Sequence, residues 1–522
     1  MKKKYVITAV IHLILIAYMV FNQNLLVNDI VEMYLLVLVT SFLFSNVFFL
    51  FKKKTPYIAY IQSELFKSSI VLIALWGVII YATQFKSIAK EDAIGDLDVL
   101  VEKLEHIHPD IYYCLPKDSF ERILMDYKRE MPDKISELEF YKGCARLTSL
   151  FKDGHTNPLI NGLQLAFRAI FPYKIRIMED RIYVIDNLTW MGRIPPGSEI
   201  VAINGRSTVQ FIDEMSRLVS FENIAWRNRL ITDPFNIAIW NNFNSYTISY
   251  KRTDAGEILK VHASGGVLSK LCIAYLSKRD RKSELEFKVL PNNIGYLGFH
   301  SCSDLKGYKE FYRQTFKEIQ ERKIQHLIID IRNNGGGHSV IGAELMQYLF
   351  DQPFKEVDSL TFKISKEIAE TGKMDFYLKP KEEDFGKLYK KVNTDPYLPR
   401  DNPLRYAGKY YLLLDNGTFS AACMFASPFK CYGDGILIGE ETGGISVGFG
   451  DVHSFSLPHS GIKVRTSWKK FWYACGIDDR RGIMPDYYIT NTIEDEILHK
   501  DRVLDYTLDL IKNKIPLQIN SN

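Results

Sequence analysis

Three short segments of the chain place reactive groups or anion-binding groups in tight turns. Asp330-Ile-Arg-Asn-Asn-Gly-Gly-Gly337 follows an apolar run, and its consecutive glycines expose backbone N–H groups that suit a negative charge. Asp415-Asn-Gly-Thr-Phe-Ser-Ala-Ala422 also follows an apolar run and places Ser420 at the start of an expected helix. Asp153-Gly-His-Thr156 holds His155 in a loop. A serine, a histidine and a cluster of free N–H groups are the parts that nucleophilic catalysis requires.

Each segment taken alone also has a structural interpretation. Serine is the commonest residue type at a helix N-cap, a run of glycines can be a flexible turn, and a loop histidine can lie at the surface. The segment around Ser420 lacks the Gly-x-Ser-x-Gly pattern of α/β-hydrolases, which argues against a lipid esterase of that fold. The combination of the three segments therefore carries more weight than any one of them.

In this order the three segments resemble the S41 family of serine peptidases, the tail-specific or C-terminal processing protease group. The resemblance covers about residues 96–486, and the Asp-Ile-Arg-Asn-Asn-Gly-Gly-Gly string is its most specific part. Pro195-Pro-Gly-Ser-Glu-Ile-Val-Ala-Ile-Asn-Gly205 is similar to the signature of the family's PDZ-like domain, a peptide-docking unit. The resemblance implies an α/β protease core with ClpP/crotonase-like layered β-α units.

Two further strings indicate the branch of the family. Where the Ser/Lys branch carries its lysine, this chain has Ile445 within Thr442-Gly-Gly-Ile-Ser446, so the Ser/Lys dyad is absent. The Thr-Gly-Gly string resembles the tricorn-like branch, which takes its histidine from the Asp-Gly-His-Thr motif. Asp479-Arg-Arg-Gly-Ile-Met-Pro-Asp486 places Asp479 where that branch has its carboxylate.

The resemblance thus implies a role for each residue. Ser420 would attack the scissile carbonyl, His155 would take and return its proton, and Asp479 would orient the imidazole. The N–H groups of Gly336 and Ala421 would bind the oxyanion. This chemistry needs no metal and no cofactor.

Several alternatives remain open at this point. Gly337 is a second candidate for the oxyanion donor, His338 for the base and Asp478 for the orienting acid. Two positions depart from the family pattern. Cys423 stands where an acidic residue is usual, and Gly154 stands where the tricorn-like branch has a serine.

The first part of the chain has the pattern of a membrane anchor. Three apolar runs of about 17 residues, at the lower limit for crossing a bilayer, cover Tyr5–Phe21, Tyr34–Phe51 and about Ser68–Gln84. Lysine triplets precede the first run and follow the second, which predicts that both triplets face the cytoplasm. The third run would then place everything after about residue 85 outside the cytoplasm, in contact with membrane lipid only through the anchor.

Pattern changes along the 522 residues predict four parts. Residues 1–90 form the anchor with three transmembrane helices, and residues 91–164 form a helical domain that ends in the Asp-Gly-His-Thr loop. Short β-rich runs over residues 165–265 form the PDZ-like domain. Residues 266–522 alternate strand and helix as the α/β catalytic core, with Lys355–Pro403 as a charged surface excursion.

Composition excludes some classes of function. The net charge of +4 is small for 60.4 kDa and argues against a nucleic-acid binder. Seven cysteines without a Cys-x-x-Cys pair argue against a zinc site.

The leading hypothesis is a membrane-anchored, extracytoplasmic serine endopeptidase that cleaves polypeptides through a Ser-His-Asp acyl-enzyme. The alternative is a catalytically silent member that binds peptide or an apolar ligand, and the oligomeric state is not predicted.

Overall fold

The computed structural model describes residues 87–160, 170–188, 192–241, 245–252, 256–263, 284–303, 305–433 and 435–512. All three predicted membrane spans lie outside these residues. Among the described residues, no helix is both long and apolar enough to cross a membrane.

The first described part is helical, as the apolar spacing predicts. It consists of α4 (Lys90–Ile107), α5 (Lys117–Glu130) and α6 (Glu137–Ser149), with a small ribbon of β1 (Ser87–Ala89) and β2 (Lys134–Ser136). Ser136 caps α6 by accepting a hydrogen bond from the Glu139 N–H, as the Ser-x-x-Glu spacing indicates. These helices bury one apolar face against residues of a neighbouring sheet, among them Leu457 and Val464.

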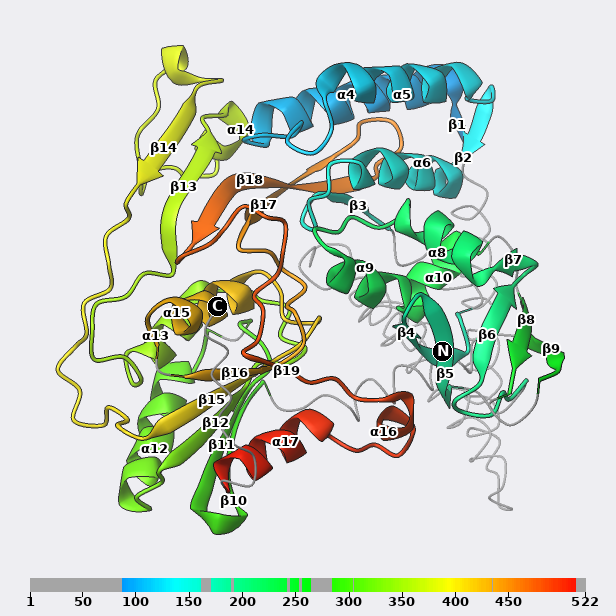
Figure 1. Ribbon diagram of the computed structural model, residues 1–522. Helices are drawn as coiled ribbons and strands as arrows, with labels where there is room; N and C mark the ends of the chain where they lie inside the picture. Colours follow the sequence, from blue (N-terminus) through cyan, green and yellow to red (C-terminus); the bar gives the residue numbers. More distant parts are fainter. Residues whose placement is uncertain are drawn as a thin grey trace, which may run out of the picture.

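A β-rich unit with its own core follows. Its strands run in the order β4-β5-β6-β8-β9, with β7 paired to β6, and all neighbours are antiparallel. The strands are β4 (Tyr173–Met178), β5 (Arg181–Asn187), β6 (Glu199–Ile203), β7 (Arg206–Ser207), β8 (Tyr246–Lys251) and β9 (Ile258–Ala263). The helices are α8 (Thr208–Ser216), α9 (Ile224–Ile231) and α10 (Pro234–Trp240). The unit lies beside the rest of the molecule (Figure 1).

The core sheet has the order β10-β11-β12-β15-β16-β19 and is parallel except for β10. Its strands are β10 (Leu285–Leu290), β11 (Ile294–Phe299), β12 (His326–Asp330), β15 (Lys409–Leu414), β16 (Ile436–Gly439) and β19 (Tyr487–Tyr488). Buried residues fill β11, β12 and β15 almost continuously, as is typical of parallel strands that are covered on both faces. The predicted alternation of strand and helix is confirmed here.

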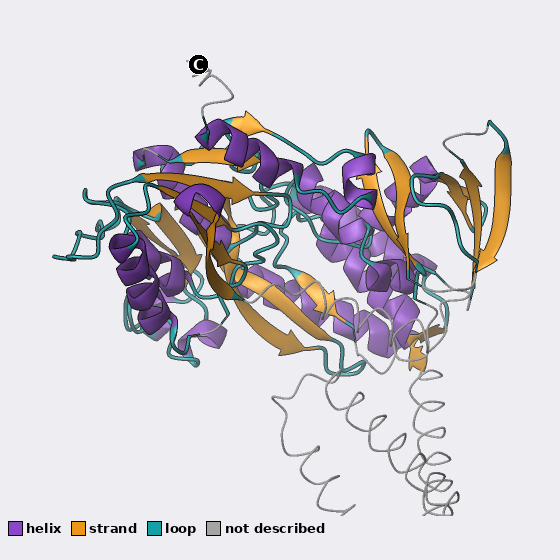
Figure 2. Ribbon diagram, turned by 90° about the horizontal axis from the view of Figure 1, so that it is seen from below, coloured by secondary structure: helices purple, strands orange, loops and turns teal. Residues whose placement is uncertain are grey.

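Helices cover both faces of this sheet (Figure 2). One face packs on α12 (Tyr308–Glu321), α13 (Ser339–Met346) and α15 (Ala421–Tyr432), and the other on α17 (Arg502–Ile511), which follows α16 (Ile493–Ile497). Arg332, just after β12, forms ion pairs with Asp330 and Asp501. The arginine of the Asp-Ile-Arg-Asn-Asn string therefore ties the sheet to α17.

A second sheet, of order β14-β13-β18-β17, lies between the core and the first helices. Its strands are β13 (Val357–Lys363), β14 (Leu388–Val392), β17 (Val447–Ser456) and β18 (Lys463–Tyr473), and β3 (Asn157–Leu159) pairs with β18. The interpretation of Lys355–Pro403 as a surface excursion is wrong for β13. Leu360 and Phe362 of that strand and Ile368 of α14 (Lys366–Ala369) are buried in the main core cluster, whereas β14 alternates exposed and half-buried residues.

Cys431 at the end of α15 and Cys475 after β18 form a disulfide bond, with Cα atoms 5.7 Å apart. The bond joins a core helix to the second sheet. Of the remaining cysteines in the described residues, Cys144, Cys302 and Cys423 are buried and Cys114 is half-buried.

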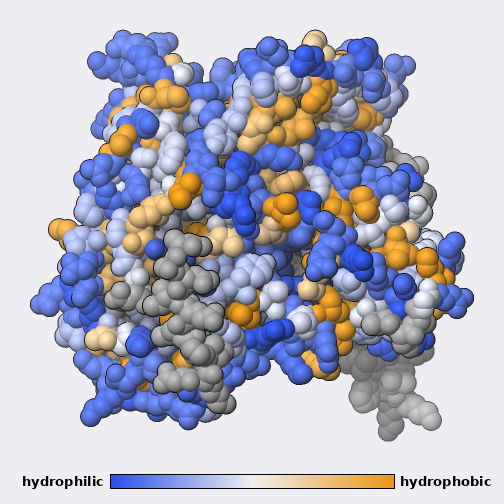
Figure 3. Space-filling view, viewed as in Figure 1, coloured by the Kyte–Doolittle hydropathy of each residue, from blue (hydrophilic) through white to orange (hydrophobic). Residues whose placement is uncertain are grey.

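On the face shown in Figure 3, hydrophilic residues predominate and apolar residues occur in small groups.

Candidate active site

Ser420 and His155 meet although 265 positions separate them in the sequence. The Nε2 atom of His155 lies 3.0 Å from the Ser420 Oγ. This is the contact through which a histidine takes a proton from a serine nucleophile. His338, the rival base, is exposed and follows the triple glycine, with no recorded side-chain contact among the described residues.

Ser420 stands at the N-cap position of α15 but does not cap the helix. Its side chain accepts no hydrogen bond from the first turn, and its backbone has φ 55° and ψ −124°. A positive φ is costly for a residue with a Cβ and is often found at sites where function requires it. The geometry thus contradicts the N-cap interpretation and presents the Oγ to His155.

Hydrogen bonds with the neighbouring triple-glycine loop hold the turn of Ser420 in place. The Phe419 N–H donates to the Asn334 carbonyl at 2.9 Å, and the Asn333 N–H donates to the Asp415 carboxylate at 2.8 Å. A Cβ on Gly336 would lie 2.8 Å from the Ala421 nitrogen and from the Ser420 Cβ. Only glycine permits the two loops to approach this closely.

The oxyanion donors differ in part from the prediction. The Gly336 N–H already donates to the Asn334 Oδ1 at 2.9 Å, so it is not free to bind an oxyanion. The N–H groups of Gly337 and Ala421 have no recorded acceptor in the part of the chain that the structure describes. The geometry therefore favours Gly337, the alternative, together with Ala421.

Two buried carboxylates face the other nitrogen of His155. Asp153 Oδ1 lies 3.6 Å and Glu222 Oε1 lies 3.7 Å from the His155 Nδ1. Asp153 is engaged elsewhere, since Oδ1 accepts the His155 backbone N–H at 2.9 Å and Oδ2 accepts the Thr156 hydroxyl at 2.5 Å. Glu222 Oε1 has no hydrogen-bond partner, and neither has the His155 Nδ1. Glu222 is thus the acid best placed to orient the imidazole.

The structure does not bring Asp479 to His155, which corrects the sequence-based assignment of the acid. Asp479 is exposed, and its carboxylate accepts the Arg481 backbone N–H at 2.9 Å. Asp478 is also exposed and accepts from the Tyr113 hydroxyl. The neighbouring Arg480 turns inward instead and donates to the Glu222 carbonyl at 2.8 Å. The segment Asp479–Asp486 therefore contacts the Glu222 loop through Arg480, but the Asp479 carboxylate does not orient His155.

Glu222 comes from the β-rich unit, between α8 and α9, and the surrounding loop is held at both sides. The Ser220 hydroxyl donates to the Thr156 carbonyl at 2.8 Å, next to His155. The Asn223 side chain caps α9 and donates to the Thr442 carbonyl at 2.9 Å. The Ile445 N–H donates to Glu222 Oε2 at 3.3 Å. The Thr442-Gly-Gly-Ile445 string therefore holds the Glu222 loop in place through hydrogen bonds.

The first of the two departures from the family pattern, Gly154, has a structural reason, and the second, Cys423, lies within the turn of Ser420. His155 stacks on Phe419 with ring centroids 4.8 Å apart, and Phe419 stacks on Trp226 at 4.2 Å. A Cβ on Gly154 would lie 2.7 Å from the Phe419 ring, so this stack excludes a serine there. The Cys423 thiol is buried and donates to the Thr418 carbonyl, inside the turn of Ser420.

The electrostatics of the cluster favour a charged imidazole. Burial lowers the pKa of His155, but Asp153 and Glu222 outweigh burial and raise this pKa to about 9. Burial raises the pKa of Glu222. Burial alone would also raise the pKa of Asp153, yet His108 and His155 hold it well below its usual range.

The same three side chains are the one group in the described residues with spacing that could hold a metal ion. The ligand atoms of Asp153, His155 and Glu222 lie within 4.8 Å of one another. A cation at this position would bind the His155 Nδ1. It would therefore compete with the hydrogen bond by which a carboxylate orients the imidazole.

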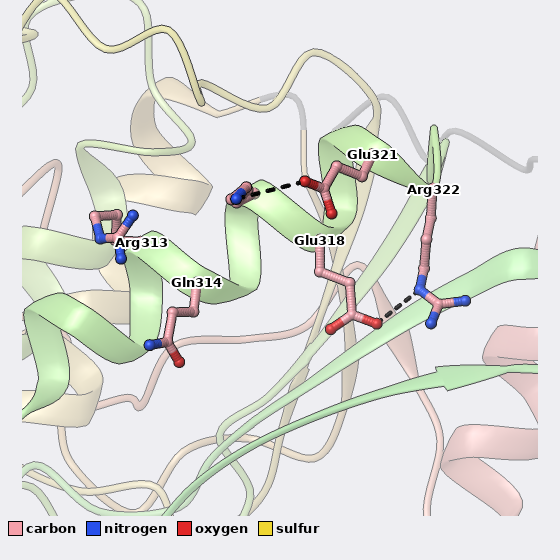
Figure 4. A pocket seen from close by; sticks show the side chains of 6 residues that line it. Arg313, Gln314, Glu318, Glu321 and Arg322 are labelled. Carbon is pink, nitrogen blue, oxygen red and sulfur yellow. Dashed lines mark hydrogen bonds and ion pairs between the residues drawn. The ribbon is translucent and has the colours of Figure 1, made fainter.

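A depression on the surface of α12 lies apart from these residues (Figure 4). Charged and amide side chains line it, and two of its ion pairs, Lys317–Glu321 and Arg322–Glu318, join residues one helical turn apart. Such pairs are typical of a solvated helix face.

Comparison with known proteins relates the core of the chain to a peptidase family. Residues 293–489 match the model of peptidase family S41. The chain therefore carries the catalytic domain of a family S41 serine peptidase in this region, which contains Ser420.

Solved structures agree at the level of the fold. Mature CPAF has a TM-score of 0.59 at 15% identity, over 82% of this chain and 99% of that chain. Mature CPAF complexed with lactacystin has a TM-score of 0.58 at 15% identity, over 83% and 99%. The tricorn protease matches 81% of this chain and 37% of its own at 17% identity, but its TM-score of 0.39 is too low to bear on the branch of the family.

Proposed function

We propose that this S41 peptidase is a membrane-anchored endopeptidase that cleaves polypeptides outside the cytoplasm through a covalent acyl-enzyme. The observation that carries the proposal is the 3.0 Å contact between the Ser420 Oγ and the His155 Nε2, on a serine whose backbone is strained and whose side chain caps nothing. Such a serine is poised to be a nucleophile.

The mechanism proceeds in two halves. His155 takes the Ser420 proton as the Oγ attacks the scissile carbonyl, and Glu222 stabilises the imidazolium through Nδ1. The N–H groups of Ala421 and Gly337 hold the oxyanion, and His155 then gives its proton to the leaving amine. Water, activated by the same imidazole, hydrolyses the acyl-enzyme. Glu222 replaces Asp479 in the Ser-His-acid set.

Two features support the proposed location. The three apolar runs and their lysine triplets predict an anchor with the peptidase on the outer side. The disulfide bond between Cys431 and Cys475 suits an oxidising compartment. The β-rich unit, which we assign as PDZ-like, would dock the polypeptide substrate by strand addition.

The test is hydrolysis of an unfolded protein by the full chain in detergent, compared with Ser420→Ala. We expect peptide fragments from the wild type and none from the variant. Binding of the unfolded protein without cleavage would establish the silent alternative. Cleavage of short-chain esters alone would point to an esterase.

A further inference from the structure

A second histidine, His108, lies behind the catalytic loop and has no part in the proposed mechanism. It follows the last residue of α4 and is 1% exposed. Its ring packs against Phe449, with centroids 4.4 Å apart. Its Nε2 lies 3.4 Å from the Asp153 Oδ2.

The hydrogen bonds of the ring fix its tautomer. The Nδ1 atom accepts the Asp110 backbone N–H at 3.1 Å, so the neutral ring carries its proton on Nε2. That N–H is buried and has no hydrogen-bond partner within the usual distance. The carboxylate of Asp153 is the acceptor that it faces.

Asp153 connects this ring to His155. One carboxylate oxygen faces His108 and the Thr156 hydroxyl, and the other holds the His155 backbone N–H and lies near the His155 Nδ1. Any change in the position or charge of Asp153 therefore changes the field at the catalytic imidazole.

We propose that His108 is a positioning residue for the hydrolysis, acting through Asp153 on His155. The inference rests on the proposed function, and His108 itself touches neither Ser420 nor substrate. The positive end of its Nε2–H dipole keeps the Asp153 carboxylate turned toward the His155 loop. It also offsets part of the negative potential of Asp153 and Glu222 at His155. The helical part of the chain thus takes part in setting the basicity of the catalytic histidine.

The test measures how three variants change the titration of His155. His108→Phe keeps a ring but removes the donor, whereas His108→Gln keeps an N–H near the position of Nε2. His106→Phe is the matched control, because His106 lies in the last turn of α4, two residues before His108, with its side chain 58% exposed. Each variant is made in the full chain, and thermal unfolding confirms that it is folded.

Two readouts are recorded against pH. The first is the rate at which a fluorophosphonate labels Ser420, and the second is carbethoxylation of His155 in the Ser420→Ala protein, which needs no activity. We expect His108→Phe to raise the pH midpoint of both readouts by about half a unit, which slows labelling about threefold at pH values below the midpoint. His108→Gln should restore most of the rate and the midpoint, and His106→Phe should change neither.

A folded His108→Phe protein with an unchanged or lowered midpoint would overturn the inference. Should His108→Phe fail to fold, His108→Asn replaces it, since its amide is too short to reproduce the Nε2 donor. Absence of labelling in the wild type would count against the proposed function. The carbethoxylation midpoint would still decide the role of His108.

Discussion

The identity of the acid is the sharpest residue-scale consequence of the structure. Glu222→Gln and Asp479→Asn make the same chemical change at the two candidates, one facing His155 and one exposed. We expect Glu222→Gln to reduce kcat by about 100-fold or more, because the imidazolium loses its partner. Asp479→Asn should remain within about twofold of the wild type. Steady-state hydrolysis of one peptide measures kcat for both variants. A larger loss in Asp479→Asn than in Glu222→Gln would show that Asp479 is the orienting acid.

The raised pKa of His155 predicts the pH profile. The base must be neutral to accept the Ser420 proton, and a pKa of about 9 keeps it protonated at neutral pH. The value of kcat/KM should therefore rise with pH and level off above about pH 9. Removing the negative charge of Glu222 lowers the pKa of the imidazole. Glu222→Gln should therefore move the midpoint to lower pH, and a midpoint that stays in place would contradict this coupling.

At the scale of elements, the site depends on the close approach of two turns. Gly336 has φ +92°, and a Cβ there would meet the Ala421 nitrogen and the Phe419 carbonyl at 2.8 Å, whereas a Cβ on Gly335 meets nothing within 4 Å. We expect Gly336→Ala to reduce kcat by about 100-fold or more by displacing the oxyanion donors. Gly335→Ala should retain most of the activity. Equal losses in both folded variants would contradict the role of this contact.

The sequence predicts those elements whose patterns are local. The continuous apolar runs of β11, β12 and β15 suit buried parallel strands, and the turns after β12 and β15 carry their motifs. The meeting of Ser420 with His155 is what the resemblance to the S41 family implies, and the two side chains are in contact in the structure. Glu222 could not be predicted, because it is a single acid between two helices of another unit. Tertiary contacts bring its loop to the site, among them those with Thr156 and Thr442.

The assignment of Asp479 also failed for a reason of tertiary structure. The motif that contains it reaches the site, but it presents Arg480 to the interior and leaves the aspartate at the surface. Which of two adjacent side chains points inward depends on backbone conformation. Arg480 itself has a φ of 62°, which no local sequence pattern at this position indicated.

At the scale of the whole molecule, the disulfide bond should contribute to stability. It closes a loop with a sequence separation of 44 residues. Replacing Cys431 and Cys475 by serine should lower the free energy of unfolding by about 2–4 kcal/mol. A reductant should lower the Tm of the wild type and leave that of the double variant unchanged. Equal Tm values for oxidised and reduced wild type would show that the bond does not stabilise the fold.

The catalytic site draws on three parts of the chain. The helical part supplies His155 and Asp153, the β-rich unit supplies Glu222, and the core supplies Ser420. Arg176 on β4 forms ion pairs with Glu440 and Glu496, which hold the β-rich unit to the core. Activity therefore requires all three parts to be assembled.

The central claim is that Ser420 is a nucleophile activated by His155. The most direct measurement is to treat the full chain with a fluorophosphonate near pH 9 and to locate the adduct by peptide mass spectrometry. We predict one adduct, on Ser420, which is lost in Ser420→Ala and strongly reduced in His155→Ala. A folded wild-type protein without a Ser420 adduct, or with full labelling in His155→Ala, would contradict the account.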